Sequence, residues 1–132
     1  MGKEFGQMTI LVDTNILIYH TKGAQIATSF LARLLTQQAL HISILTKIEF
    51  LGWDKHTAEG FEKCQRLINT AHIYPVEENI SNKAIELKRR SSIKLADSVI
   101  AATALLNNLK LATRNTDDFR GIDGLEIINP FE

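Results

Sequence analysis

The N-terminal part of the chain contains a short apolar run that stops at a polar cluster. Met8–Val12 is rich in apolar and β-branched residues, Asp13 ends it, and a helix is expected to begin at Asn15. A run this short, apolar on both faces, is typical of a buried strand in a parallel sheet. Ligands of such sheets bind in the crevice outside the carboxyl ends of the strands. The pattern therefore predicts that Asp13 stands at the mouth of a site, with Thr14 beside it.

Short apolar runs alternate with amphipathic segments along the rest of the chain. The runs that predict further strands are Leu40–Leu45, Ala71–Val76, Leu109–Thr113 and Leu125–Ile128. The segments that predict helices are Asn15–Tyr19, Ala24–Gln38, Lys47–Trp53, Ala58–Thr70, Ile80–Arg90 and Leu95–Asn108. Strands that alternate with helices require right-handed crossovers. The predicted fold class is therefore α/β, with three α/β/α layers and a mainly parallel sheet of about five strands.

Length, composition and charge narrow the class of protein. We expect one domain over residues 1–132, in which 1–7 form an N-terminal extension. No apolar run approaches the ~20 residues of a membrane span, and the start lacks the apolar segment of a secretory signal. Cys64 is the only cysteine, which suits a reducing compartment, so we expect a cytoplasmic protein without membrane association. Lys and Arg together number 15, as do Asp and Glu, which excludes a generic basic nucleic-acid binder.

Acidic residues lie where predicted strands end or helices begin. Asp13 and Glu49 follow the first two strands, Asp97 lies early in an apolar helix, and Asp117 and Asp118 lie in the turn after the fourth strand. The carboxyl ends of parallel strands share one edge of a sheet, and the helix of Asp97 can begin over that edge. The predicted topology therefore gathers three or four carboxylates in one crevice.

Each of these acids also has an ordinary structural explanation. Asp13 can cap the helix that it precedes. Glu49 lies three residues after Thr46, and the sequence T-K-I-E has the pattern of a capping box. Asp97 is favoured near a helix N-terminus by the helix dipole. No single acid therefore indicates a functional site, and only their expected meeting in one crevice favours one.

A cluster of carboxylates requires a proton or a cation. Two carboxylates ~4 Å apart repel by about 4 kcal/mol at an effective dielectric constant near 20. Sites made only of oxygen ligands suit Mg²⁺ or Mn²⁺, which keep bound waters and bridge to phosphates. Such an ion can activate a water and stabilise charge on a phosphate, so the cluster favours phosphodiester hydrolysis.

The sequence offers little for other chemistries. The four histidines lack the spacing of a zinc site; they are His20, His41, His56 and His72. The sequence contains no G-x-S-x-G, Walker-type or G-x-G-x-x-G motif.

Four segments in this order resemble the PIN domain family, in particular the VapC-type toxins of bacterial toxin–antitoxin pairs. They are LVDTNILIY, TKIEFLG, KLADSVIAATAL and LATRNTDDF, and the resemblance runs from about Ile10 to the INPF end. It implies a small α/β/α fold and a Mg²⁺- or Mn²⁺-dependent ribonuclease. It also implies homodimers, and inhibition by a cognate antitoxin that occupies the groove.

The resemblance assigns roles to individual residues. Asp13 and Asp97 match the two principal metal-binding aspartates of the family, and Glu49 matches its acidic residue after the second strand. The fourth acid departs from the pattern, because Asn115 stands where many relatives have an aspartate after the T-R dipeptide.

Two aspartates can replace the missing fourth acid. We favour Asp117 as catalytic and metal-binding, because Asp118 precedes Phe119 in a possible structural turn. Asp118 and Asn115 are then supporting residues. Further side chains that can donate supporting hydrogen bonds are Thr14, Asn15, Ser98 and Thr113.

Basic residues next to the acidic junctions are candidates to contact RNA. Lys47, Lys94 and Arg114 have this position, and Lys88–Arg90 either extends the surface or forms a solvated helix end. Trp53 can stack on a base, or pack in the core or at a dimer contact.

Two other functions stay open at this point. A catalytically weak PIN-like module that only binds a partner protein is compatible with Asn115. A phosphoacceptor receiver-type domain also places an aspartate after its first strand, but it needs an acidic pair there, and Thr14 follows Asp13.

Overall fold

Five short strands form one parallel sheet. The computed structural model describes residues 9–132, so the expected extension 1–7 and the first residue of the expected first strand lie outside the described residues. The sheet order is β3-β2-β1-β4-β5, and all neighbours are parallel. The strands are β1 (Ile10–Val12), β2 (His41–Ser43), β3 (His72–Tyr74), β4 (Lys110–Ala112) and β5 (Ile127–Ile128). The predicted fold class is confirmed.

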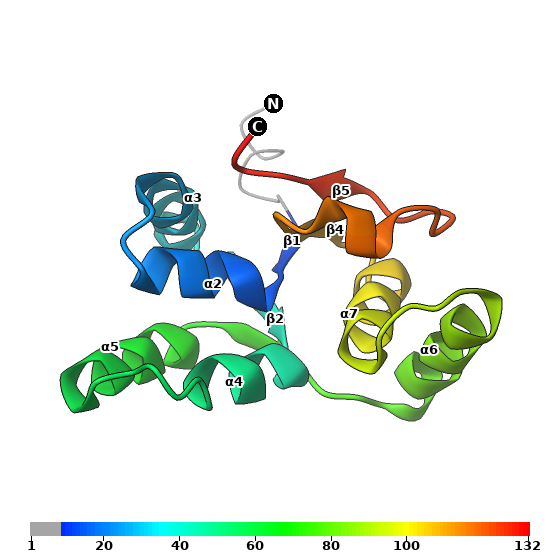
Figure 1. The fold of residues 1–132 in the computed structure, drawn as a ribbon, viewed down its shortest axis with the longest axis horizontal. Helices are drawn as coiled ribbons and strands as arrows, with labels where there is room; N and C mark the ends of the chain where they lie inside the picture. The colour runs from blue at the N-terminus through cyan, green and yellow to red at the C-terminus, as the bar shows by residue number, and fades with distance from the viewer. Residues whose placement is uncertain (1–8) are drawn as a thin grey trace.

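Helices cover both faces of the sheet. They are α2 (Thr14–Thr21), α3 (Gln25–Thr36), α4 (Ile44–Leu51), α5 (Ala58–Asn69), α6 (Glu78–Arg90), α7 (Leu95–Leu106) and the 3₁₀ turn η1 (Thr116–Phe119). Figure 1 shows α2 and α3 on one side of β1, and α6 and α7 on the other. Within residues 9–132, none of the helices combines the length and the apolar character that crossing a bilayer requires.

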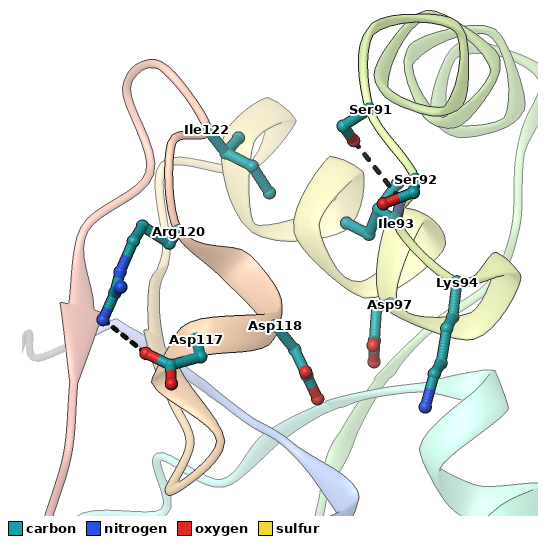
Figure 2. Close-up of a pocket in the computed structure, with 9 residues that line it drawn as sticks. All are labelled: Ser91, Ser92, Ile93, Lys94, Asp97, Asp117, Asp118, Arg120 and Ile122. Atoms are coloured by element: carbon teal, nitrogen blue, oxygen red, sulfur yellow. Dashed lines mark hydrogen bonds and ion pairs between the residues drawn. The ribbon is translucent and has the colours of Figure 1, made fainter.

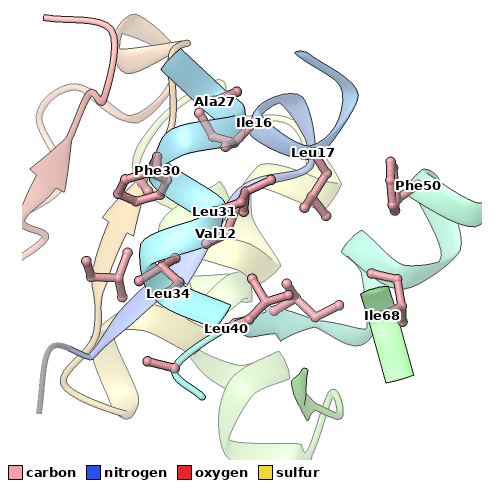
Figure 3. Packing of buried hydrophobic residues seen from close by; sticks show 14 of the residues in the cluster. Val12, Ile16, Leu17, Ala27, Phe30, Leu31, Leu34, Leu40, Phe50 and Ile68 are labelled. Carbon is pink, nitrogen blue, oxygen red and sulfur yellow. The ribbon is translucent and has the colours of Figure 1, made fainter. Parts of the chain in front are cut away.

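The side chains of β1 alternate between two hydrophobic cores. Ile10 and Val12 belong to the core under α2 to α5, and Leu11 belongs to the core under α6 and α7. This alternation follows from the two-residue period of a strand. Figure 3 shows how Val12 packs in the first core among side chains of α2 and α3. Burial on both faces fixes the register of β1, and therefore where Asp13 emerges.

The order in which strands are added to the sheet reverses at β1. From β1 it passes to β2 and β3 on one side, and later to β4 and β5 on the other. Val12 pairs with Ala112, so Asp13 and Thr113 leave adjacent strands at the same level. A crevice forms outside the carboxyl ends of strands at such a switch point. Asp13 lies in this crevice.

The second strand is shorter than predicted, and the capping box is wrong. Helix α4 begins at Ile44, and its N-cap is Ser43, whose hydroxyl accepts a hydrogen bond from Leu45 N at 3.1 Å. Thr46 is therefore a buried residue inside the helix and not its N-cap. The serine at the strand end provides the cap first, and Glu49 is free of the capping role that the T-K-I-E pattern suggested.

Candidate active site

Four carboxylates from four segments lie along one cleft. Asp13 follows β1, Glu49 lies on α4, Asp97 lies in the first turn of α7, and Asp118 belongs to η1. All four line a cleft of about 520 Å³, which we call the acidic cleft. Asp13, Glu49 and Asp97 thus line one cleft, as the order of strands and helices predicts.

The Asp13 carboxylate is held by three hydrogen bonds. Only 5% of the residue is exposed. Its Oδ1 accepts from Thr14 N at 2.8 Å, and its Oδ2 accepts from Asn15 Nδ2 at 2.9 Å and from the Thr113 hydroxyl at 2.8 Å. Asp13 is also the N-cap of α2. The capping and site interpretations are therefore both correct in geometry, because the bonds that cap the helix fix the carboxylate at the cleft.

Asn15 connects the ends of β1 and β4. Its Nδ2 lies 3.0 Å from Thr113 Oγ1, and its Oδ1 accepts from Arg114 N at 3.2 Å. The buried Thr113 hydroxyl also accepts from Asn115 N at 3.0 Å. These bonds join the backbone after β4 to the side chains around Asp13, so the two strand ends form one rigid floor.

Thr14 holds the Glu49 carboxylate in a comparable way. The Thr14 hydroxyl lies 2.6 Å from Glu49 Oε1 and 3.1 Å from Thr46 Oγ1. A hydroxyl has one proton and an ionised carboxylate only accepts, so Thr14 donates to Glu49 and can accept from Thr46. Two parts of the sequence pattern, the D-T-N turn and the T-K-I-E segment, thus serve the same site.

The electrostatics of the cleft are dominated by buried negative charge. Burial raises the pKa of Asp13 from 3.8 to about 6, with smaller contributions from Asp97 and Glu49, against hydrogen bonds that lower it. The pKa of Asp97 is also raised, first by burial and then by Asp118 and Glu49, whereas Lys94 lowers it. Like charges that are brought together in this way favour a bound cation or a proton.

Asp118, and not the favoured Asp117, faces the acidic cleft. Figure 2 shows Asp118 and Asp97 directed toward the same space, while Asp117 turns aside and pairs with Arg120. Asp117 lines a neighbouring hollow together with Asp97 and Asp118 but does not line the acidic cleft, and its side chain is 79% exposed. Successive residues of a 3₁₀ turn point about 120° apart, so adjacent aspartates cannot share one direction. The geometry of the acidic cleft therefore favours Asp118 over Asp117 as the fourth acid.

Ser98, Lys47 and Arg114 do not line the acidic cleft. The buried Ser98 hydroxyl donates to Leu95 O of its own helix at 2.6 Å. Lys47 is not among the side chains that line the cleft, whereas Lys94 is.

Arg114 is held by aromatic rings. Its guanidinium carbon lies 4.8 Å from the ring centre of Tyr19 and 4.2 Å from that of Phe131, and the two rings lie 5.2 Å apart. These contacts fasten the C-terminal residues to α2. Arg114 does not line the acidic cleft, so these contacts are structural.

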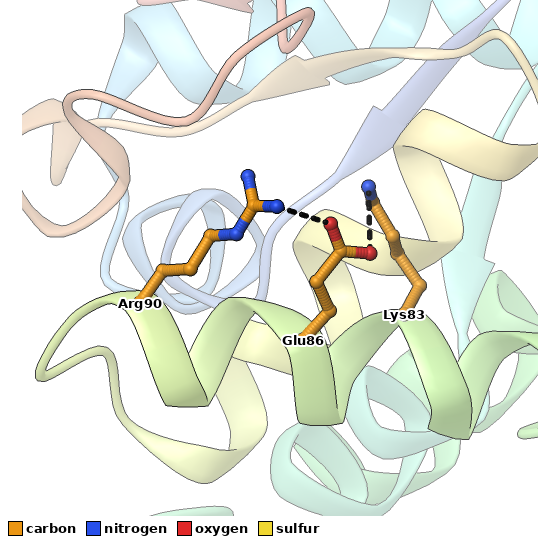
Figure 4. Close-up of polar contacts among 3 residues, drawn as sticks. All are labelled: Lys83, Glu86 and Arg90. Atoms are coloured by element: carbon orange, nitrogen blue, oxygen red, sulfur yellow. Dashed lines mark hydrogen bonds and ion pairs between the residues drawn. The ribbon is translucent and has the colours of Figure 1, made fainter.

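The basic end of α6 is engaged within its own neighbourhood. Figure 4 shows Glu86 between Lys83 and Arg90, with N–O distances of 3.3 Å to each. Lys88 Nζ donates to Ile93 O at 2.9 Å. Lys88 and Arg90 therefore bind groups near the end of their own helix, which favours the interpretation of Lys88–Arg90 as a helix end over an RNA-binding surface.

The donor set of the acidic cleft suits a hard divalent cation. Carboxylate oxygens are preferred ligands of Mg²⁺ and Mn²⁺. In residues 9–132, no three His, Cys, Asp or Glu side chains are already arranged around one metal position. Mg²⁺ usually binds through one or two carboxylates and keeps several waters, so an open set of carboxylates fits it.

One wall of the cleft is not indicated by the pattern of acidic residues. This wall contains Ile18, Tyr19 and Lys22 from α2 and its C-terminal end, and Trp53 also lines the cleft. A helical period starting from Thr14 leads to Ile18 and Lys22. This spacing could have revealed the wall once Asp13 was placed at the site.

Comparison with known proteins identifies the family. The family model of the PIN domain matches residues 10–125. The chain belongs to the PIN domain family. It is 36% identical over 115 residues to Ribonuclease VapC10 of Mycobacterium tuberculosis, a match that covers 83% of this chain and 85% of that protein.

Solved structures of similar fold include toxin–antitoxin complexes. This PIN domain chain matches a toxin–antitoxin complex from Klebsiella pneumoniae with a TM-score of 0.77 and 32% identity, over 94% of this chain and 99% of that one. VapBC2 from Rickettsia felis, bound to a DNA fragment from its promoter, matches with a TM-score of 0.78 and 23% identity, over 92% and 98% of the two chains. The second likeness concerns the fold alone.

Proposed function

We propose that this PIN domain chain is a divalent-metal-dependent endoribonuclease and the toxin of a VapBC-type toxin–antitoxin pair. The observation that carries the proposal is the meeting of four carboxylates from distant segments at the switch point of the sheet. The family match and the names of two similar proteins, a ribonuclease and a toxin–antitoxin complex, support it.

In this proposal, the acidic cleft holds Mg²⁺ or Mn²⁺. Asp13 and Asp97 would be the principal ligands, and Glu49 and Asp118 would complete the acidic set in place of Asp117. The ion, when bound, supplies an activated water and stabilises charge on the phosphate. Asp118 then takes the role that Asn115 cannot fill, because an amide does not carry the negative charge.

The other residues of the cleft position these carboxylates and the substrate. Asn15 and Thr113 hold Asp13, and Thr14 holds Glu49, each through the hydrogen bonds described above. Lys94 lines the cleft beside Asp97 and would offer positive charge to an RNA phosphate. Lys47 and Arg114 would act farther along the backbone of the RNA.

The direct test is cleavage of RNA by the purified protein. We expect cleavage with Mg²⁺ or Mn²⁺ and none after chelation of the ion with EDTA. Equal rates with and without EDTA would contradict the proposal, as would the absence of cleavage with either ion.

Thr14→Val should lower the cleavage rate about 10- to 100-fold, because loss of a residue that orients a metal ligand typically has this effect. Thr14→Ser keeps the hydroxyl and should restore most of the activity. Thr28→Val is the matched control, since the Thr28 hydroxyl bonds His20 away from the cleft at 2.8 Å. If Thr14→Val and Thr28→Val were equally active, Thr14 would have no role in positioning Glu49.

A cognate antitoxin is the proposed protein partner, and a homodimer the proposed assembly. The alternative of a catalytically weak binding module rests on Asn115 at the rim of the cleft. It would be favoured by retained antitoxin binding in a protein that binds no metal. The receiver-type interpretation gains nothing from the site, because Thr14 stands where a receiver needs a second acid after the first strand. The cytoplasmic location stays a prediction.

A further inference from the structure

Trp53 lies at the acidic cleft without a role in either hydrophobic core. It follows α4, four residues after Glu49, and lines the cleft together with the carboxylates. Among the described residues, it belongs neither to the two clusters of buried side chains nor to the apolar side chains packed against them. A large, half-buried indole at this position is therefore not explained by packing of the core.

The indole is held at a defined angle. Its ring lies 5.1 Å from that of His56 at an interplanar angle of 85°, an edge-to-face contact. His56 is itself fixed, because its Nε2 donates to Phe50 O at 2.7 Å. Within residues 9–132, no aromatic ring stacks in parallel on Trp53. The indole is thus oriented in advance but has no stacking partner.

The groups around Trp53 match the parts of a single-stranded nucleic acid. The carboxylates can bind a cation, and Lys22 and Lys94, which line the same cleft, can face phosphates. An aromatic face can stack on any unpaired base. The bases of a duplex are stacked on one another inside the helix, so they cannot reach such a wall.

We propose that Trp53 is a stacking platform for an unpaired base of the RNA, next to the phosphate that the acidic cleft receives. This inference rests on the proposed ribonuclease function and assigns Trp53 to the binding of its RNA.

The chain contains one tryptophan, so its emission reports on Trp53 alone. The experiment uses the variant Asp97→Asn in buffer with Mg²⁺, because this substitution should prevent cleavage of the RNA. The probes are a short oligouridine, an RNA duplex, and linear polyphosphate of matched charge. We expect saturable quenching of the emission by oligouridine, and little change with the duplex or with polyphosphate.

Substitutions test the same contact without using the emission. Binding of labelled oligouridine, measured by anisotropy, should be about 5- to 150-fold weaker for Trp53→Ala and nearly unchanged for Trp53→Phe. Phe61→Ala is the control, because Phe61 contacts His56 but does not line the cleft. Circular dichroism checks that each variant is folded.

The outcomes separate this inference from the proposed function. Cleavage of RNA without quenching in the binding experiment would overturn the platform and leave the ribonuclease. Quenching by oligouridine without cleavage by the unsubstituted protein would support the platform and contradict the ribonuclease. An emission that changes only with protein concentration would assign Trp53 to a contact between copies, and would overturn the inference.

Discussion

Asp97→Asn should lower the rate of RNA cleavage by at least about 100-fold. Loss of a residue that only orients a metal ligand costs about 10- to 100-fold, and loss of the ligand itself should cost more. Asp97 is suited to this test because its side chain makes none of the side-chain hydrogen bonds found among residues 9–132, and it does not cap α7. The substitution therefore removes a charge from the cleft with little change to the fold. Initial rates with saturating Mn²⁺ and unstructured RNA measure the effect.

Glu86→Gln is the matched control for this substitution. Glu86 is a carboxylate of α6 that pairs with Lys83 and Arg90 and does not line the acidic cleft. Exposed ion pairs contribute little to stability, so this variant should keep the activity of the unsubstituted protein. Equal activity of Asp97→Asn and Glu86→Gln would contradict the assignment of Asp97.

The second large effect is a loss of stability with rising pH in metal-free buffer. The folded-state pKa of Asp13 is raised from 3.8 to about 6, so the folded protein binds this proton more tightly than the unfolded chain. The stabilisation is complete below about pH 4 and is lost as the pH rises through about 6, with an upper limit of about 3 kcal/mol. Urea unfolding in EDTA at a series of pH values measures it.

Asp13→Asn isolates this contribution from those of other acids. Asparagine can still cap α2, but its amide NH₂ meets the donors of Asn15 and Thr113, so the comparison concerns the slope with pH and not the absolute stability. The variant should lose less stability between pH 4 and 7 than the unsubstituted protein. Mg²⁺ should restore stability at pH 7 to the unsubstituted protein only. If the free energy of unfolding of both proteins changed equally with pH, the pKa of Asp13 would not be raised in the folded state.

The carboxylates that follow strands could be predicted from the sequence because the topology alone brings strand ends together. Asp13 and Glu49 needed only the order of strands and helices. Asp97 needed the additional assumption that its helix begins over the same edge, which is correct. For these residues, the alternation of short apolar runs with helices contained the required information.

Other features depended on local geometry that the pattern does not encode. Asp117 and Asp118 are adjacent and chemically identical, and only the turn of η1 decides which one faces the cleft. Ser43 and Thr46 both can cap a helix, and the end of β2 decides in favour of Ser43. The contact of Arg114 with Phe131 joins residues whose interaction no local periodicity indicates.

In this proposal, carboxylates that are far apart in the sequence form one binding site for a divalent cation in the acidic cleft. Isothermal titration calorimetry of the purified protein with Mn²⁺ tests it most directly, with Asp97→Asn and Glu86→Gln titrated in parallel. We predict that Mn²⁺ binds to the unsubstituted protein and to Glu86→Gln, and that Asp97→Asn loses this binding. No heat of binding with the unsubstituted protein, or an undiminished affinity in Asp97→Asn, would contradict the account.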